Sequence, residues 1–163
     1  MKRKHYGTRD RFGKSAGNPK SGSRFPSRLE SRIKMILLDK KINFDSQFPI
    51  FYKNDCKKRW FFYDVKLSDT NILIEVNGDY WHANPSVYKS DDLIHFRTQT
   101  ITANDIWIKD GKKIQVANEQ GYVVLTIWEK DLIQMSDNDV LKVIFNFIEE
   151  NENVNETGKD SKN

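Results

Sequence analysis

The sequence is poor in the residues that cross-link a chain or anchor it in a membrane. Its 163 residues include one cysteine, Cys56, so neither an intramolecular disulfide nor a cysteine-based zinc cage can form within the chain. No apolar segment is long enough to span a bilayer, and no signal-peptide core follows the basic start. These absences predict a soluble protein of a reducing compartment, the cytoplasm, with no membrane partner.

The ends of the sequence differ strongly in charge. The net charge is +4, and the stretch 1–28 is crowded with lysine and arginine, with Asp10 as its only acidic residue. We expect a flexible basic arm over residues 1–26, one globular domain over 27–150, and a disordered polar and acidic tail over 151–163. The arm could contact phosphates, releasing counterions from them, or it could merely keep the chain in solution.

Two short apolar runs with a turn between them predict a β-hairpin at the centre of the chain. Residues 61–67 and 72–77 are rich in β-favouring side chains, and 68–71 is a turn sequence. Pairing of the two strands would bring Asp64 close to Glu75. Two neighbouring carboxylates suit a hard divalent cation such as Mg²⁺.

His82 follows this hairpin after two aromatic residues, and an imidazole can exchange protons near neutral pH. Metal ligands and a titratable ring would then converge at one strand end, within reach of a reacting group. Structural explanations stay open for the same residues. Asp64 could be an ordinary edge residue, Glu75 could pair with Lys66 across the hairpin, and His82 could be a half-buried neighbour of Trp81.

The remaining segments alternate between helix and strand signals. Ser27 and Glu30 form a capping box at the start of a helix that runs to about Lys41. Glu30 either only closes that box or also points at the metal site, and the sequence favours the first. The other expected elements are a strand over 42–52, a loop with a short helix over 84–104, a helix over 105–120 with Gly121 as its stop, a buried strand over 122–128 and a last helix from Ser136 or Asp137. This order predicts an α/β fold with a central mixed β-sheet flanked by helices.

Several of these segments together resemble one group of nucleases. Glu30, the strand that carries Asp64, the tract 74–82 (IEVNGDYWH), Asp110 ahead of a basic helix, and the run 121–129 occur in a fixed order. That order and spacing are similar to those of the very-short-patch-repair (Vsr) endonucleases. This branch of the PD-(D/E)XK, or restriction-endonuclease-like, superfamily includes phage homing endonucleases of the EDxHD type.

The resemblance covers residues 27–131 and implies a restriction-endonuclease-like fold and a Mg²⁺-dependent endonuclease acting on duplex DNA, with Mn²⁺ able to substitute, in a bacterial or phage-infected cell. The implied catalytic residues are Asp64, Glu75 and the carbonyl of Val76 as metal ligands, Glu30 as the residue that orients a metal-bound water, His82 as the acid or base, and Asp110 as the last acidic residue of the set. The expected DNA contacts are Tyr80 and Trp81, where repair relatives insert aromatic wedges, and the basic residues Lys109, Lys112, Lys113, Arg24 and Arg28.

The sequence also departs from the family. The places of the structural zinc ligands in the repair enzymes hold Asp79, Asn84, Ser86 and Lys130. With no cysteine or histidine at these places, no structural zinc is expected. Asn77 stands where the repair enzymes have a second histidine and where the superfamily motif has lysine. His82 is then the main acid–base candidate, the number of metals is open, and mismatch repair is disfavoured as the biological role.

Two other functions remain as alternatives. One is a catalytically inactive DNA-binding module on the same fold, and the other is a nuclease that acts on RNA or branched DNA. The retained Asp64, Glu75 and His82 argue against the inactive module. Because the sequence shows no separate recognition domain, a homodimer or an accessory recognition protein is a further expectation.

Overall fold

The computed structural model describes residues 27–53 and 58–157, with residues 152–157 as backbone alone. The basic arm expected over residues 1–26 therefore lies outside the described residues. The elements follow in the order α1 (Arg28–Asp39), β1 (Phe44–Lys53), β2 (Lys58–Leu67), β3 (Ile72–Asn77), β4 (Leu93–His95), β5 (Thr100–Thr102), α2 (Ala103–Glu119), β6 (Val123–Trp128), α3 (Glu129–Gln134) and α4 (Asp137–Thr157).

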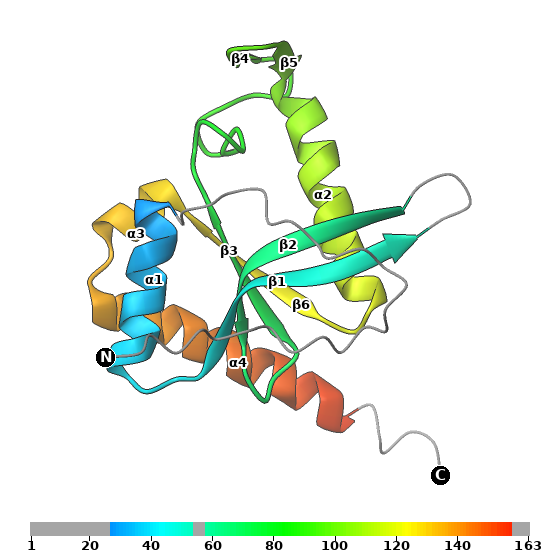
Figure 1. Ribbon diagram of the computed structural model, residues 1–163. Coiled ribbons are helices and arrows are strands. Elements are labelled where there is room, and N and C mark those ends of the chain that lie inside the picture. Colours follow the sequence, from blue (N-terminus) through cyan, green and yellow to red (C-terminus); the bar gives the residue numbers. More distant parts are fainter. Residues whose placement is uncertain (1–26, 54–57, 158–163) are drawn as a thin grey trace, which may run out of the picture.

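A mixed sheet of four strands forms the centre of the fold, in the order β1-β2-β3-β6 (Figure 1). β1, β2 and β3 form an antiparallel meander, and β6 pairs in parallel with β3 after the chain has crossed over through α2. α1, α3 and α4 pack on one face of the sheet, and α2 packs on the other. The predicted α/β fold, with a central mixed sheet flanked by helices, is confirmed.

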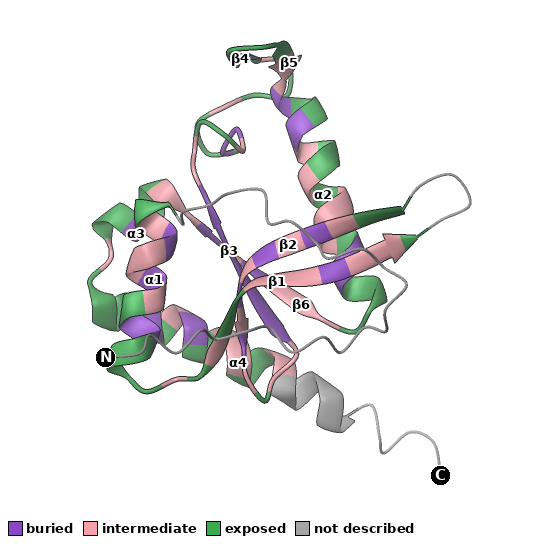
Figure 2. Cartoon of the chain, in the orientation of Figure 1, coloured by how far each residue is buried: buried purple, intermediate pink, exposed green. Residues whose placement is uncertain are grey.

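β3 is the most enclosed strand because helices cover both of its faces. Ile72, Ile74 and Val76 pack with the core formed by α1, α3 and α4, whereas Leu73 packs with the core under α2. This is the alternation that a strand imposes on successive side chains. All residues of β3 are buried (Figure 2), so the polar side chains that it carries are held away from solvent.

Side chains of β2 that should share one face of the strand pack on opposite faces of the sheet before and after Asp64. Val65 and Leu67 pack with the core of α1 and α4, but Phe61 and Tyr63 pack with the core of α2. These four positions have the same parity and would share one face of a regular strand. The local twist at Asp64 therefore turns the first half of β2 toward α2.

The same point is where β2 parts from β3. The ladder between them pairs Val65 with Ile74 and Lys66 with Leu73, and it does not continue to Asp64. Pairing of β2 with β1 continues to the ends of both strands, so the two leave the sheet as a ribbon beside α2 (Figure 1). This separation creates space between β2 and β3.

Four details differ from the expected elements. The loop over 84–104 contains a small antiparallel hairpin, β4 with β5, in place of a short helix. α3 follows β6 directly, and β6 is a partly buried edge strand and not a fully buried one. α4 continues to Thr157, past the expected domain boundary at residue 150. No helix in the described part of the chain is long and apolar enough to cross a membrane.

Candidate active site

An open cleft of about 590 Å³ lies where β2 separates from β3. Its lining includes most of the residues that the sequence singled out: Glu30, Asp64, Glu75, Val76, His82, Lys109, Asp110 and Lys113. The other residues singled out lie elsewhere: Asn77, Tyr80, Trp81, Lys112 and Arg28 are not part of the lining, and Arg24 lies outside the described residues. The fold thus brings together side chains from α1, β2, β3 and α2, whose catalytic roles stay predictions.

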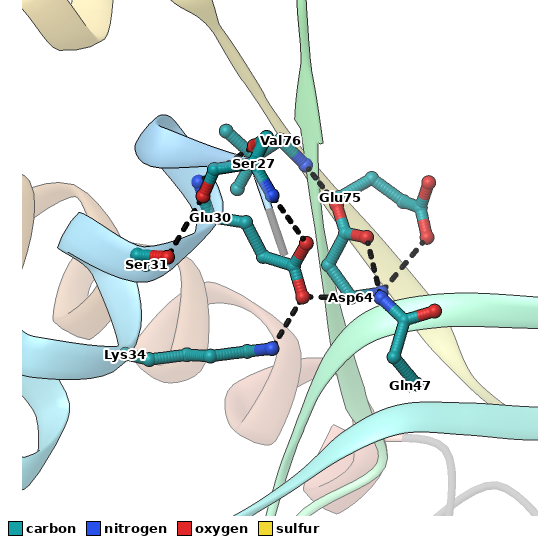
Figure 3. A network of polar contacts seen from close by, with 8 residues as sticks. All are labelled: Ser27, Glu30, Ser31, Lys34, Gln47, Asp64, Glu75 and Val76. Atoms are coloured by element: carbon teal, nitrogen blue, oxygen red, sulfur yellow. Dashed lines mark hydrogen bonds and ion pairs between the residues drawn. The ribbon is translucent and has the colours of Figure 1, made fainter. Parts of the chain in front are cut away.

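Asp64 and Glu75 contact each other across the point where the strands part (Figure 3). The backbone N–H of Asp64 donates to Oε1 of Glu75 at 3.3 Å, and Oδ2 of Asp64 accepts from the backbone N–H of Val76 at 2.9 Å. Side chains therefore satisfy backbone groups that the interrupted ladder leaves free. The predicted approach of the two acidic residues through the hairpin is confirmed.

The two carboxylates differ in their charge partners. Nζ of Lys113, from α2, lies 2.5 Å from Oε2 of Glu75. The alternative prediction, that Glu75 pairs with Lys66, is wrong, because the ammonium group of Lys66 donates to two backbone carbonyls at the turn instead. Among the ion pairs of the described residues none involves Asp64, whose Oδ1 accepts from the neutral side-chain amide of Gln47 at 3.3 Å.

Burial makes both carboxylates costly to ionise. It raises the pKa of Glu75 to about 7, although the ammonium of Lys113 partly offsets the effect. Burial likewise raises the pKa of Asp64 above its ordinary value, against the opposing hydrogen bond from Val76. A cation in the cleft would lower both pKa values, because it favours the charged forms. Without a cation, burial thus disfavours the ionised form of both side chains.

Glu30 faces the same cleft from the first turn of α1. Its Oε2 accepts from the backbone N–H of Ser27 at 3.3 Å, and Oγ of Ser27 accepts from the N–H of Glu30 at 3.0 Å, which confirms the predicted capping box. Oε1 of Glu30 contacts the ammonium of Lys34 and accepts from the amide of Gln47 at 3.0 Å (Figure 3). Glu30 thus closes the box and also lines the cleft, beside Gln47 and Asp64, and its role at a metal site stays a prediction.

His82 reaches the cleft from the segment that follows β3. Its Nδ1 lies 2.6 Å from Oδ2 of Asp110, which projects from the middle of α2. A carboxylate at Nδ1 favours the tautomer with the proton on that nitrogen and holds the ring in one orientation. Nε2 is then the nitrogen that can exchange a proton with a group in the cleft.

A cluster of polar side chains holds the segment that carries His82. Nδ2 of the buried Asn84 donates to Oδ1 of Asp79 at 2.6 Å, and Oδ1 of Asn84 accepts from the backbone N–H of Ser86 at 2.9 Å. Nζ of Lys130 lies 3.4 Å from Oγ of Ser86. Asp79, Asn84, Ser86 and Lys130 thus converge here as a hydrogen-bonded cluster.

The donor set of the cleft suits a hard cation. Asp64 and Glu75 supply carboxylate oxygens, and Val76 borders the same space. Within residues 27–53 and 58–157, no three side chains of His, Cys, Asp or Glu are grouped so as to enclose a metal ion. Mg²⁺ does not need such a cage, since it usually takes one or two carboxylates and fills its shell with waters and substrate phosphates.

Tyr80 and Trp81 lie at the surface, next to His82 in the chain. Trp81 is 66% exposed and stacks on Phe96, with ring centroids 5.4 Å apart and an interplanar angle of 13°. Tyr80 packs edge-on against both rings, and its hydroxyl donates to the carbonyl of His95. The three rings form an exposed aromatic cluster, which offers faces for base stacking. The sequence did not reveal Phe96 as its third member.

The lysines of α2 do not share one surface. Lys109 and Lys113 line the cleft, where Lys113 is paired with Glu75. Lys112 instead lies over an aromatic ring of β1, 4.9 Å from its centroid. Arg28 is exposed at the start of α1. The three lysines are therefore divided between the cleft and the β1 side of α2, and their contacts with DNA stay a prediction.

Asn77, which the sequence singled out, and Gln47, which it did not, have surroundings that the sequence did not indicate. Asn77 is 8% exposed at the end of β3, and its Oδ1 is buried without a hydrogen-bond partner in the described part of the chain. Gln47 lines the cleft and bridges two of its carboxylates. Gln47 stands in β1 directly after Asp45 and Ser46, and a polar residue in such a mixed strand is too common a pattern to assign a role.

Comparisons with known proteins yield one distant similarity. No model of a known protein family matches the chain, and no curated protein matches it. A solved structure, the catalytic domain of the homing endonuclease I-Bth0305I, is similar with a TM-score of 0.41 and 21% sequence identity, over 72% of this chain and 94% of that chain. At this distance the similarity concerns the arrangement of helices and strands and says nothing about activity.

Proposed function

We propose that the protein is a Mg²⁺-dependent DNA endonuclease of the Vsr-like, EDxHD type, and that it hydrolyses phosphodiester bonds in the cleft between β2 and β3. The observation that carries the proposal is Asp64, a partly buried carboxylate outside every ion pair of the described residues. It faces the same cleft as the His82–Asp110 pair. Glu30, Asp64, His82 and Asp110 also follow one another in the order that the EDxHD name gives.

Asp64 and Glu75 would hold the cation, with the carbonyl of Val76 as a further oxygen ligand and with Mn²⁺ able to replace Mg²⁺. When bound, the ion supplies positive charge to the phosphate oxygens and makes a bound water more acidic. The chain contributes a fixed geometry. The N–H of Val76 holds Oδ2 of Asp64, and Lys113 holds Oε2 of Glu75. The other oxygen of each carboxylate accepts one hydrogen bond of 3.3 Å and has a second lone pair that could face a cation.

His82 provides the proton chemistry. With Nδ1 held by Asp110, Nε2 can take a proton from the attacking water or give one to the leaving oxygen. Such transfer typically accounts for about 10²–10⁴-fold in rate. Glu30, fixed by Ser27, Lys34 and Gln47, would orient a water on the α1 side of the cleft.

Positive charge at the cleft suits a phosphodiester substrate. Arg59, Lys109 and Lys113 line the cleft together with the carboxylates. Cationic side chains bind nucleic-acid backbones through the phosphates, independently of sequence. This arrangement supports a DNA strand that enters over the ribbon of β1 and β2 and passes α2.

A plasmid-nicking assay tests the proposal. Supercoiled plasmid is incubated with the full chain in Mg²⁺, in Mn²⁺ and in EDTA, and the nicked, linear and supercoiled forms are separated on a gel. We expect cleavage with either metal and none in EDTA. Binding in a mobility-shift assay without any nick would instead support the inactive DNA-binding module. Faster cleavage of RNA or of a branched junction than of linear duplex would assign a different substrate.

A further inference from the structure

Gln47 has a strained backbone that places it in the cleft. It lies inside β1 with a φ of +51°, a left-handed conformation that is uncommon for any residue other than glycine. The register of β1 with β2 is the same on either side, but Gln47 and Asp64, which would oppose each other, are not paired. Strained residues of this kind persist where the surrounding structure imposes them, and they cluster at functional sites.

The side chain of Gln47 lies between two carboxylates (Figure 3). Its Nε2 donates to Oε1 of Glu30 at 3.0 Å and to Oδ1 of Asp64 at 3.3 Å. Only the NH₂ end of the amide can donate to both carboxylates, because ionised carboxylate oxygens accept hydrogen bonds and do not donate them. The NH₂ group is neutral, so it occupies the space beside Asp64 without neutralising the negative charge there.

We propose that Gln47 is an additional ligand of the cation, held in the reverse orientation until the ion enters. A half turn about the last side-chain bond exchanges Oε1 with Nε2 and changes the shape of the side chain little. Without a cation, this rotation would place the amide oxygen against the carboxylate oxygens of Glu30 and Asp64, which would repel it. With a cation beside Asp64, the amide oxygen becomes a ligand of the type that Mg²⁺ and Mn²⁺ accept. The inference rests on the proposed function, because it requires a cation at Asp64.

The strained backbone fits this role better than a purely structural one. A hydrogen bond between two neighbouring elements could be made by a side chain from a relaxed strand position. The left-handed residue instead interrupts the β1–β2 pairing opposite Asp64 and directs into the cleft a neutral amide that can present either its nitrogen or its oxygen. An amide adds an oxygen ligand without adding charge, which matters beside carboxylates that are already costly to ionise.

The test measures Mn²⁺ binding by electron paramagnetic resonance in the absence of DNA. Gln47→Met keeps the side-chain length and the same left-handed backbone cost but has no amide oxygen. We expect it to bind Mn²⁺ about tenfold more weakly than the wild type, at the lower end of losses seen for supporting residues of metal sites. Gln47→Glu, which restores an oxygen ligand, is expected to bind at least as tightly as the wild type. Gln115→Met is the control, because Gln115 is exposed, hydrogen-bonds with Lys112 and Glu119 on α2, and is not part of the cleft lining, so binding should be unchanged.

Binding by Gln47→Met that equals or exceeds that of the wild type would overturn the ligand role and leave the proposed function intact. A wild-type protein that binds no Mn²⁺ would overturn both.

A second measurement needs no variant that alters the cleft. In a ¹⁵N NMR titration with diamagnetic Mg²⁺, the side-chain NH₂ signals of Gln47 should shift as they lose their carboxylate partners, and those of Gln115 should not. Unchanged Gln47 signals at saturating Mg²⁺ would overturn the proposal even if Gln47→Met failed to fold.

Discussion

The burial of Glu75 predicts how the stability of the metal-free protein depends on pH. Its pKa in the folded state is about 7, against an ordinary value of 4.5. Between these values the folded chain holds a proton that the unfolded chain has released. A raised pKa therefore contributes stability that is fully present below pH 4.5 and is lost as the pH rises through 7. Asp64, whose pKa burial also raises, acts in the same direction.

The magnitude follows from the two pKa values. Their difference corresponds to about 3 kcal/mol of unfolding free energy, at roughly 1.36 kcal/mol for each pKa unit. Part of this is already lost by pH 5.5, so about 2 kcal/mol should be lost between pH 5.5 and pH 8. Glu75→Gln cannot ionise and should lack this part of the pH dependence.

The assay is urea unfolding followed by circular dichroism, in EDTA, at several pH values between 5.5 and 8. The informative quantity is the difference in slope between wild type and variant, because Glu75→Gln also removes the ion pair with Lys113 and so changes the absolute stability. Glu119→Gln, an exposed acidic residue of α2, is the matched control and should keep the wild-type slope. Equal slopes for the wild type and Glu75→Gln would refute the reasoning that Glu75 is costly to ionise.

Three further predictions concern the neighbourhood of His82. His82→Ala should retain only a trace of the wild-type single-turnover cleavage rate, a loss of about 10²–10⁴-fold, and undiminished cleavage would contradict its role in proton transfer. Asn84→Ala should lower the unfolding free energy by about 1–3 kcal/mol in urea titrations, because it leaves Asp79 without its buried partner, and a loss near zero would contradict the cluster. Trp81→Ala should weaken DNA binding by about 1–3 kcal/mol in fluorescence anisotropy with little change in urea midpoint, if the exposed ring stacks on a base, and equal affinity would remove Trp81 from the DNA contacts.

The local signals in the sequence predicted the elements well where one rule dominates. The Ser27–Glu30 capping box, the central hairpin and the glycine at position 121, with a φ of +82°, each follow from short-range chemistry. The hairpin alone brought Asp64 next to Glu75, so that part of the candidate site was predictable. The grouping of Glu30, His82 and Asp110 came from the resemblance to a family, since nothing local in the sequence relates them.

Other features depend on three-dimensional packing that no local pattern encodes. The choice of Lys113 as partner of Glu75 follows from the way α2 lies against β3, and Lys66 was an equally good partner on strand pairing alone. The exchange of faces at Asp64 breaks the alternation on which strand predictions rely. The place of Gln47 depends on a left-handed residue inside a strand, which the sequence gives no reason to expect.

The central claim is that Asp64 anchors a cation on which cleavage depends. The most direct measurement compares plasmid cleavage by the wild type and by Asp64→Ala over a range of Mg²⁺ concentrations, with Asp39→Ala, an exposed acidic residue at the end of α1, as the control. Because Asp64→Ala also removes a partly buried carboxylate and its hydrogen bond with Val76, its fold is checked by circular dichroism. We predict that the wild type and Asp39→Ala nick the plasmid only with Mg²⁺ and that folded Asp64→Ala gives no cleavage at any concentration. Equal Mg²⁺-dependent cleavage by Asp64→Ala and the wild type would contradict the account.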